Sequence, residues 1–380
     1  MILLLYVFSC SRNWDNPYDP NSENFGIVWT GSHNLDIASL KFNSTGSTLV
    51  STSFDSTIKC WNAINGDLLW EKKQDSYVFT ASISPDDRRV ATVDYRSAVK
   101  VYDLKTGEIE WVGEHSPWVM SVLYNQAGTR VATGAENTVK LWDANTGSLL
   151  WSGENPIYIS ALAFSPDDSI LVTGSGNRGT IDSTMGFGEG INNIKTWDVS
   201  TGNHLWTREL SGKIQYIDIS PDGQMIVTGN HDQTVRAWDI HTGALLWSYL
   251  RSGSTDDSIV IFSPDGNSII ISDNNYIVKL DANSGSSLWR ETFSTSSWIK
   301  SMASSYDGSR IALHTERDLH VVDPEREEQL WSGSYGSANI DRSAFSRLAI
   351  NPEGSQIVTG DGDGNVIAWV VEEGYEVTLP

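Results

Sequence analysis

The 380-residue sequence is poor in cysteine and in basic residues. Two cysteines, Cys10 and Cys60, are too few to build the disulfide framework of a small secreted domain, so each needs its own explanation. The 26 Lys and Arg residues stand against 48 Asp and Glu, which gives a formal net charge of −22. Nucleic acid and anionic lipid surfaces are therefore unfavourable partners, because proteins bind both through a basic face.

The apolar run at the start of the chain, residues 1–9, is too short to cross a bilayer, which takes roughly 20 apolar residues. It leads into Val7-Phe8-Ser9-Cys10 and then into a polar stretch that contains Pro17 and Pro20. The four residues ending at Cys10 resemble the lipobox of a bacterial lipoprotein signal. That resemblance implies that Cys10 is lipidated, and Ser11 after it implies sorting to the outer membrane.

This resemblance divides the chain. Residues 1–9 become a truncated signal-like segment, since the basic residues that usually precede the apolar run are missing. Residues 10–24 become a tether and residues 25–380 the folded domain. The alternative is an apolar N-terminus that packs or frays, in a cytoplasmic protein. The side of the outer membrane is left open.

Tryptophan is the residue in excess: the chain has 16, where average composition gives about five. One series recurs at intervals of 41, 41, 40, 55, 41, 42 and 42 residues, namely Trp29, Trp70, Trp111, Trp151, Trp206, Trp247, Trp289 and Trp331. A second series lies nine residues before seven of these: Trp61, Tyr102, Trp142, Trp197, Trp238, Leu280 and Val322, with Trp369 as its eighth member. Such a period indicates a repeat architecture.

Short alternating segments and tight turns fill each repeat. In one, an apolar alternation over residues 159–164 is followed by Ser165-Pro166-Asp167-Asp168 and by another apolar segment over 170–173. Alternation of this kind predicts half-buried antiparallel strands, and the proline fixes φ in the turn between them. No helical period is present. We therefore expect an all-β fold with four strands in each repeat.

These features resemble the WD40-repeat family over most of the chain after residue 25. Ser-Pro-Asp-Gly turns, the Trp-Asp ending and an acidic residue six positions before the tryptophan position all match, the last at Asp55, Asp232, Asp363, Glu136 and Glu316. The family implies that these acidic side chains close turns. Its histidine has counterparts only in His33 and His115, which limits the family's hydrogen-bonded tetrad to two repeats.

A second resemblance is to the tryptophan-docking motif of eight-bladed quinoprotein-like propellers. Asp-x-x-Thr-Gly-x-x-Leu-Trp recurs at residues 143–151, 198–206 and 239–247. The resemblance implies that each tryptophan stacks on the glycine turn of the neighbouring blade. Residues 26–30 lack three preceding strands, and Trp369 ends three strands without a fourth, so together they complete one blade. We therefore expect a single eight-bladed β-propeller closed by its N-terminal strand.

Enzyme signatures are weak. A quinone-dependent dehydrogenase would need a carboxylate cluster holding calcium, and the family's adjacent cysteines are missing. There is no Gly-x-Ser-x-Gly motif, and the seven histidines lack metal-ligand spacing. Residues 361–365 look like a calcium loop, but Val366 stands where the glycine is required. We expect no catalytic residues, no metal and no cofactor, with Cys60 a buried thiol.

An insertion sets one repeat apart. The 55-residue interval contains an excess at residues 175–192 between the second and third strands, and it includes Arg178 and Phe187. Long loops on a rigid scaffold commonly bind ligands, although a purely decorative insertion explains the length equally well. Arg178 and Phe187 are therefore candidate binding residues.

A column read across the repeats gives the other candidates. Counting eight residues back from the first turn after each innermost strand selects Asp36, Tyr77, Trp118, Tyr158, Lys213, Asp256, Trp298 and Ala344. The next residue is apolar in seven of the eight repeats, as a core position should be. The column is instead rich in aromatic and charged residues, which suit a recognition surface at the channel mouth, although loop packing alone also explains them.

Two hypotheses follow. In the first, a monomeric, lipid-tethered envelope propeller binds a protein, peptide or glycan through its top face, without nucleic acid and with the lipid as its one membrane contact. In the second, the channel holds a cofactor or an active site. Propeller lipoproteins that assist outer-membrane protein assembly share the eight-bladed ring and the anchor, which makes that role a further alternative. The ligand itself cannot be deduced from the sequence.

Overall fold

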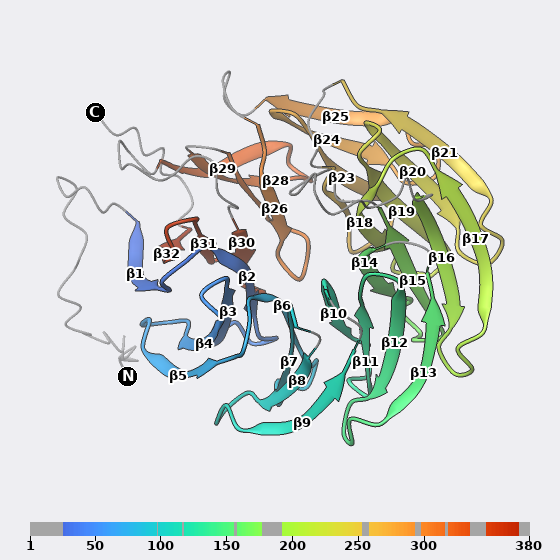
Figure 1. Cartoon of the computed structure of the whole chain (residues 1–380). Coiled ribbons are helices and arrows are strands. Elements are labelled where there is room, and N and C mark those ends of the chain that lie inside the picture. The colour runs from blue at the N-terminus through green and yellow to red at the C-terminus, as the bar shows by residue number, and fades with distance from the viewer. Residues whose placement is uncertain are drawn as a thin grey trace, which may run out of the picture.

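Eight antiparallel sheets of four strands are arranged around a ring (Figure 1). The computed structural model describes residues 26–96, 98–115, 118–155, 158–176, 192–252, 258–292, 298–315, 318–334 and 347–371. Within these residues the chain forms 32 strands and no helix. The predicted all-β, eight-bladed propeller is therefore confirmed. The division at residues 9 and 24 lies outside the described residues.

Seven blades use four consecutive strands each, running from the ring axis to the rim. Blades 1 to 4 contain β2 (Ile37–Phe42), β3 (Thr48–Ser53), β4 (Thr57–Asn62) and β5 (Leu68–Lys73); β6 (Val78–Ile83), β7 (Arg89–Asp94), β8 (Ala98–Asp103) and β9 (Ile109–Glu114); β10 (Ser121–Tyr124), β11 (Arg130–Gly134), β12 (Thr138–Asp143) and β13 (Leu149–Glu154); β14 (Ile159–Phe164), β15 (Ile170–Ser175), β16 (Asn192–Asp198) and β17 (His204–Leu210).

The remaining blades follow the same plan, except that the last draws its outer strand from the start of the chain. Blades 5 to 8 contain β18 (Ile214–Ile219), β19 (Met225–Asn230), β20 (Thr234–Asp239) and β21 (Leu245–Leu250); β22 (Val260–Phe262), β23 (Ser268–Asp273), β24 (Tyr276–Asp281) and β25 (Ser287–Thr292); β26 (Ser301–Ser304), β27 (Ile311–His314), β28 (Asp318–Asp323) and β29 (Glu328–Ser334); β30 (Arg347–Ile350), β31 (Gln356–Gly360), β32 (Asn365–Val370) and β1 (Ile27–Ser32).

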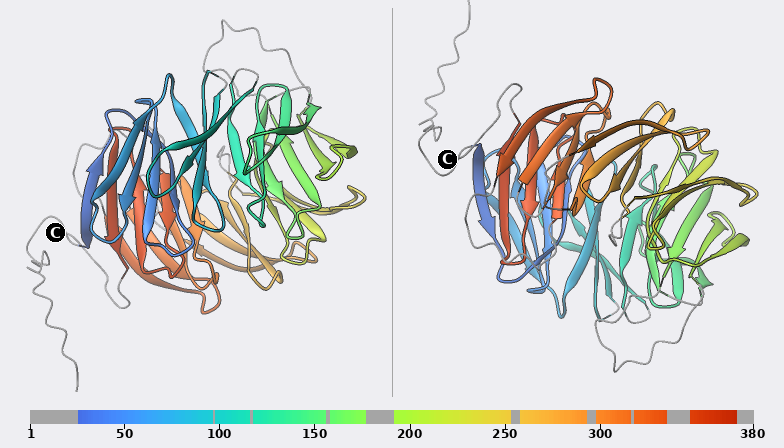
Figure 2. Two further views of the ribbon diagram at one scale, coloured as in Figure 1. Left: turned by 90° about the horizontal axis from the view of Figure 1, so that it is seen from below. Right: turned by 90° about the horizontal axis from the view of Figure 1, so that it is seen from above.

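Ring closure occurs between the two ends of the described chain. β1 pairs antiparallel with β32, from Ile27 opposite Trp369 to Ser32 opposite Asn365. Figure 2 shows the first strand, in blue, beside the last strands, in red. The pairing covers the edge that β32 would otherwise expose, as the strand count predicted.

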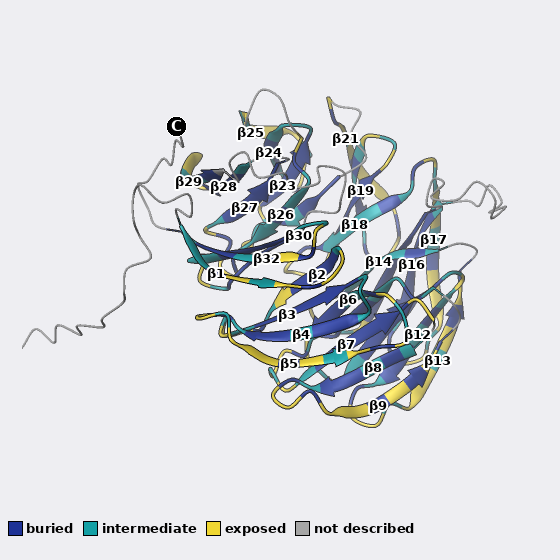
Figure 3. Cartoon of the chain, turned by 60° about the vertical axis from the view of Figure 1, so that its left-hand side comes forward, coloured by how far each residue is buried: buried dark blue, intermediate teal, exposed yellow. Residues whose placement is uncertain are grey.

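The core lies between the blades. Second strands such as β15 are buried along their whole length, because each is covered on both faces by neighbouring blades. Outer strands such as β5 and β9 instead expose most residues around a buried tryptophan, as the yellow segments of Figure 3 show. Burial therefore falls from the middle of each blade towards the rim.

The docking tryptophans join neighbouring blades. Six of them donate the indole N–H to a backbone carbonyl of the next blade at 2.7–2.9 Å, and we call these six the docking belt: Trp29, Trp70, Trp111, Trp151, Trp206 and Trp247. Each also lies against a turn glycine with positive φ, as Trp111 does against Gly147 (φ 70°). Four of the six stack on the aromatic ring of the second series, as Trp111 does on Trp142 with ring centroids 6.2 Å apart. The resemblance to tryptophan-docking propellers holds in geometry.

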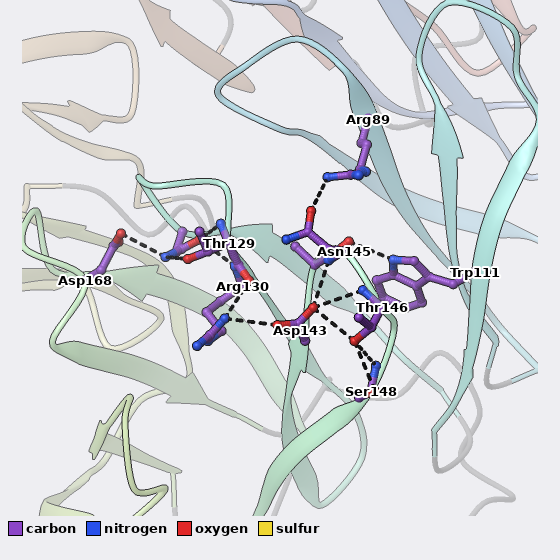
Figure 4. A network of polar contacts seen from close by, with 11 residues as sticks. Arg89, Trp111, Thr129, Arg130, Asp143, Asn145, Thr146, Ser148 and Asp168 are labelled. Atoms are coloured by element: carbon purple, nitrogen blue, oxygen red, sulfur yellow. Dashed lines mark hydrogen bonds and ion pairs between the residues drawn. The ribbon is translucent and has the colours of Figure 1, made fainter.

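The Trp-Asp ending builds the turn on which the docking tryptophan rests. Asp143 accepts hydrogen bonds from the N–H groups of Asn145 and Thr146 and from the Thr146 hydroxyl (Figure 4). Burial acts to raise the pKa of Asp143, and these bonds more than offset it, so that the pKa lies below its ordinary value. Asp103 and Asp239 make the same contacts in their own blades.

The docking pattern changes between blades 6 and 7. Glu327 occupies the place of the turn glycine with φ 58°, a backbone conformation unfavourable for a residue with a Cβ. The carbonyl of Pro324, which stands where the other blades accept the indole bond, accepts instead from Lys279 Nζ at 3.2 Å. Lys279 also forms an ion pair with Glu325 at 2.8 Å. This seam therefore substitutes a partly exposed ion pair for a buried aromatic contact.

The turns after the innermost strands also interlock from blade to blade. Where one turn carries proline, the next blade places a glycine against it, as Gly128 lies against Pro85. Where the turn carries Ser44 or Gln126, the next blade has Asp87 or Asp168, whose carboxylate accepts the exposed N–H at 2.8 Å. The reason is that proline offers no N–H to bind. The seven pairings that follow this rule are distributed around the ring.

Three further expectations have structural outcomes. Cys60 is buried and free, as expected, and burial raises its thiol pKa to about 12. The insertion does connect β15 with β16, but residues 177–191 lie outside the described residues. In blade 6 Ser258, one residue after the position that counting selects, lies against Gly229, and Asp257 itself lies outside the described residues.

Candidate functional site

A buried hydrogen-bonded network in blade 1 surrounds His33, which lies in the loop between β1 and β2. His33 lies 2.8 Å from the Thr57 hydroxyl through Nδ1 and 2.7 Å from the Ser51 hydroxyl through Nε2. Trp61 donates its indole N–H to the same Ser51 oxygen at 2.8 Å. Asp55 approaches His33 at 3.3 Å. The tetrad expected for His33 is therefore complete, and it ties the top loop to the Trp-Asp strand.

The electrostatics of this network follow from its burial. Burial lowers the pKa of His33 to about 4, although Asp55 acts in the opposite direction. Burial also acts to raise the pKa of Asp55, but hydrogen bonds from the Asn34 N–H and from Thr57, together with His33, hold it below its ordinary value. At neutral pH the network therefore contains a neutral imidazole beside a carboxylate.

The acidic positions carried over from the WD40 resemblance have mixed outcomes. Asp232 closes its turn by accepting from the Thr234 N–H at 3.2 Å and hydroxyl, and it pairs with Arg236 at 2.7 Å. In blade 8 the closing carboxylate belongs to Asp361, which accepts from the N–H groups of Asp363 and Asn365. The role expected for Asp363 is thus performed two residues earlier, at the position where Asp94 of blade 2 accepts from the N–H groups of Arg96 and Ala98. Glu316 lies outside the described residues.

The predicted column lies beside the loops that follow each second strand. The carbonyls of Asp36, Tyr77, Tyr158 and Lys213 accept from the N–H groups of Phe54, Tyr95, Gly176 and His231 at 2.9–3.1 Å. These bonds place the two sets of loops together on one face, which we call the top face. The expectation that both loop types share a face is therefore confirmed.

Three column residues join a continuous series of aromatic rings. The series, which we call the aromatic row, crosses blades 1 to 4 with neighbouring ring centroids 5.6–6.2 Å apart and consists of Phe54, Tyr77, Phe79, Tyr95, Trp118 and Tyr158. Tyr77 is 50% exposed, and the Trp118 ring is half-buried. The row is therefore an ordered apolar surface accessible to solvent.

Trp118 occupies the middle of the row. Tyr95 of blade 2 stacks on it at 5.8 Å and Tyr158 of blade 4 at 5.6 Å, with interplanar angles of 28° and 15°. Its backbone has φ 64°, a left-handed conformation that is rare for a bulky side chain. Strain of this kind persists where surrounding contacts enforce it, and it is concentrated at functional sites.

The other predicted site residues lie apart from the row or outside the described residues. Lys213 in blade 5 adds no ring to the aromatic row. The aliphatic part of its side chain packs on Gly176. Trp298 in blade 7 is 50% exposed, with Lys300 Nζ 5.3 Å from its ring centroid. Asp36 is half-buried. Asp256, Arg178 and Phe187, together with Cys10, lie outside the described residues.

Sequence reasoning missed Phe54, Phe79 and Tyr95. A usable signal was present: Phe54 and Tyr95 each lie 18 residues after a column residue, Asp36 and Tyr77. The backbone bonds between these positions show that this spacing brings the two loops into contact. Reading a second column at that offset would have identified both rings.

Other features of the described residues are less suited to binding. A small cleft at the bottom of the seam between blades 6 and 7 is lined by Phe262, Pro264, Ile311, Pro324 and Glu325, among others. Among the described residues, no group of three His, Cys, Asp or Glu side chains is placed to hold a metal ion. The same residues include no helix that is long and apolar enough to cross a membrane.

Three family profiles match parts of the chain. The WD domain, G-beta repeat, matches residues 27–62, which contain the complete tetrad of His33, Ser51, Asp55 and Trp61. The chain is an eight-bladed β-propeller that contains a WD40-type repeat. Outer membrane protein assembly factor BamB matches residues 54–186, and the EMC1 N-terminal beta-propeller domain matches residues 192–323. The second of these two profiles describes a β-propeller domain, in agreement with the fold.

Curated relatives match segments of this propeller. The mitotic checkpoint protein bub3 of Dictyostelium discoideum is 32% identical over 26% of this chain and 29% of its own length. The serine-threonine kinase receptor-associated protein of the same organism is 32% identical over 24% and 31%. Eukaryotic translation initiation factor 3 subunit I of Drosophila willistoni is 22% identical over 53% and 64%. The matches thus span about three tenths of the first two relatives.

A solved structure agrees over a greater length. The computationally designed Ika8 protein superposes with a TM-score of 0.72 at 23% identity, over 90% of this chain and 98% of its own. At that identity the likeness shows the fold alone.

Proposed function

We propose that this protein is a non-enzymatic binding scaffold that captures a protein or peptide partner through the aromatic row of its top face. The observation that carries the proposal is the row itself: six rings in contact across four blades, with Tyr77 50% exposed. Aromatic residues are enriched where protein interfaces concentrate their binding energy. One chain forms the complete ring, so a single chain is the binding unit.

Ring orientation favours a protein or peptide over a glycan. Trp118 has Tyr95 on the side of blade 2 and Tyr158 on the side of blade 4, so its faces are already covered. The row therefore offers mainly ring edges, which carry partial positive charge and suit carbonyl oxygens and aliphatic side chains. A sugar ring would need a free aromatic face on which to stack.

The row is also preorganised. Phe54 is held next to Asp55 of the buried tetrad, and the Trp118 N–H is directed to the Tyr95 carbonyl at 3.4 Å. Rigid aromatic side chains lose little entropy on binding, which improves affinity for a given contact area. These features support a docking surface that does not need to rearrange.

We further propose that the propeller acts at the cell envelope as a lipid-anchored protein, with Cys10 as the lipid site and residues 10–24 as its tether. The support is the Val7-Phe8-Ser9-Cys10 pattern. A specific observation favours a more precise alternative: the assembly-factor profile covers residues 54–186, and the whole aromatic row lies inside that range. An accessory role in outer-membrane protein assembly is therefore the second candidate function.

The test is capture of partners by photo-crosslinking in the native cells, using a photoreactive residue at Ser76, beside the row. We expect the wild-type chain to yield a defined crosslinked partner and the triple variant Tyr77→Ala, Trp118→Ala, Tyr158→Ala to lose it. Trp298→Ala is the matched control, because Trp298 is as exposed as Tyr77 but lies in blade 7.

Three outcomes are distinguishable. Loss of capture in the triple variant with retention in Trp298→Ala supports the row. Undiminished capture by the triple variant contradicts the site. A Cys10→Ala form that no longer fractionates with membranes supports the anchor, and one that fractionates unchanged contradicts it; both results are independent of the row.

A further inference from the structure

Each blade ends at the rim in an outer strand that is the last member of its sheet. A strand in that position has one row of backbone N–H and C=O groups directed outwards, which can pair with another strand. Proteins commonly prevent such pairing by placing charged side chains on the edge. The eight outer strands can therefore be compared with one another as edges.

The eight outer strands differ in the number of charged side chains that they carry. Six outer strands carry at least one charged side chain: β5 has Glu71, Lys72 and Lys73, and β9, β13, β17, β25 and β29 carry one or more Glu or Arg. The two without charge are β1 and β21. In β1 the two aliphatic residues before the tryptophan, Ile27 and Val28, are only partly exposed.

β21 is the unprotected edge. Its sequence is Leu-Leu-Trp-Ser-Tyr-Leu, and Leu245, Leu246 and Leu250 are 52%, 47% and 71% exposed. Figure 1 places it on the outside of the ring, on the side away from the two termini. A bulge sets Leu245 and Leu246 together opposite Trp238 of β20, and both exposed side chains leave apolar surface at the outer edge of the sheet.

We propose that β21 pairs with β21 of a second copy of this chain, in an antiparallel, twofold symmetric arrangement that joins two blades into one eight-stranded sheet. With the strands centred on each other, Leu250 of one copy lies opposite the bulge formed by Leu245 and Leu246 of the other, and Tyr249 lies beside that bulge. Aliphatic and aromatic cross-strand pairs of this kind stabilise antiparallel sheets. A twofold contact of one surface with itself closes at the dimer.

Charge is the reason for a second copy as occupant. Two molecules with a net charge of −22 repel each other, so self-association requires a region of low charge. β21 carries none, and its neighbours at the rim, β17 and β25, each carry one Arg and one Glu. The outer strands of blades 4 to 6 thus carry no net charge.

The strength of the contact follows from its size. Stable complexes bury about 1,200 Å² or more in total, and two six-residue strands supply less than that. We therefore expect a dimer that dissociates on dilution through the micromolar range. Because β21 lies at the rim, the top face of each copy stays accessible, and the dimer would present two aromatic rows.

The test is sedimentation velocity of the chain carrying Cys10→Ala, which removes any contribution of a lipid, from about 1 µM to about 200 µM. We expect a reversible shift from monomer to dimer. Leu250→Lys or Leu246→Lys places a charge on the edge and should reduce association at least tenfold, with thermal unfolding unchanged. Hydrogen exchange of β21 amides should slow at the higher concentration.

Leu69→Lys is the matched control, because Leu69 is 51% exposed at the equivalent position of β5, an edge that is already charged. It should associate like the parent chain. A parent chain that is monomeric throughout overturns the proposal. So does a dimer that survives Leu250→Lys, or one that Leu69→Lys disrupts equally. None of these results depends on the partner of the top face.

Discussion

The docking belt and the aromatic row are both made of aromatic rings in contact, yet they differ in every other respect. The belt repeats around the ring, five of its six tryptophans are at most 9% exposed, and each donates its N–H to the next blade. The row occurs in blades 1 to 4 only, its rings are half-exposed, and Trp118 at its centre has a strained backbone.

The difference separates what the fold requires from what is particular to this chain. A contact that recurs in six blades at the same distance serves the joint between blades. A contact that breaks the repeat, stays exposed and holds a residue with φ 64° has no architectural equivalent among the described residues of the other blades. The site is therefore better identified by departure from the repeat than by the repeat itself.

The largest expected effect compares one tryptophan from each region. Trp111→Ala removes a side chain that is 7% exposed and a hydrogen bond to Ala144, so it should lower the free energy of unfolding by about 3–5 kcal/mol. Trp118→Ala removes a half-buried ring and should lower it by about 1 kcal/mol. Urea unfolding measures both. Equal losses would mean that the row is as structural as the belt.

A smaller effect tests the glycine turns of the belt. A Cβ at Gly147 would lie 2.7–2.9 Å from the Trp111 ring in a residue with φ 70°, so Gly147→Ala should destabilise by about 2–4 kcal/mol. Glu327→Gly has the opposite sign, since it relieves φ 58° in the one docking turn without glycine, and should stabilise by about 0.5–1 kcal/mol. Thermal unfolding of both variants decides whether the seam of blades 6 and 7 is the weak joint.

The smallest effect concerns acid. Burial lowers the pKa of His33 from 6.5 to about 4, so between these values the unfolded chain binds more protons than the folded one. Stability contributed by the neutral imidazole is therefore complete above pH 6.5 and is lost as the pH falls towards 4, by about 1–3 kcal/mol. His314, whose pKa burial lowers to about 3, acts with the same sign.

The measurement is the free energy of unfolding from pH 4 to 7, in the parent chain and in His33→Gln. The variant should have a lower stability at pH 7 and a shallower slope. If capture of the partner follows the same curve, the tetrad positions the row through Phe54, which is adjacent to Asp55. If capture stays constant while stability falls, the two regions are independent.

Sequence reasoning reached the architecture because the fold imposes a period on the chain. The spacing of Trp29 to Trp331 predicted eight blades, and the unmatched segments around Trp29 and Trp369 predicted the closure that β1 and β32 form. Half of the aromatic row was also predicted, since Tyr77, Trp118 and Tyr158 occupy one repeated position.

The remaining features depend on contacts between different positions of neighbouring repeats. Comparing one repeat position across the blades does not reveal such contacts. Phe54 and Tyr95 enter the row because a backbone bond brings the next loop against the column. One turn position is occupied by glycine in some blades and by Asp87 or Asp168 in others. Which residue stands there depends on whether the turn of the preceding blade carries proline, so the rule relates two blades. Asp361 closes its turn in place of Asp363, as Asp94 does in blade 2, so counting back from the tryptophan position does not by itself decide which carboxylate reaches the N–H groups.

The closure of the ring by β1 also has a consequence for folding. Its partners are residues 365–369, at the far end of the chain, so the first strand to be synthesised is the last to be paired. Seven blades can form from neighbouring strands, but blade 8 requires a contact of very high sequence separation, which slows folding. During that interval the edge of β32 is open, and assembly of the whole domain waits on one six-residue strand.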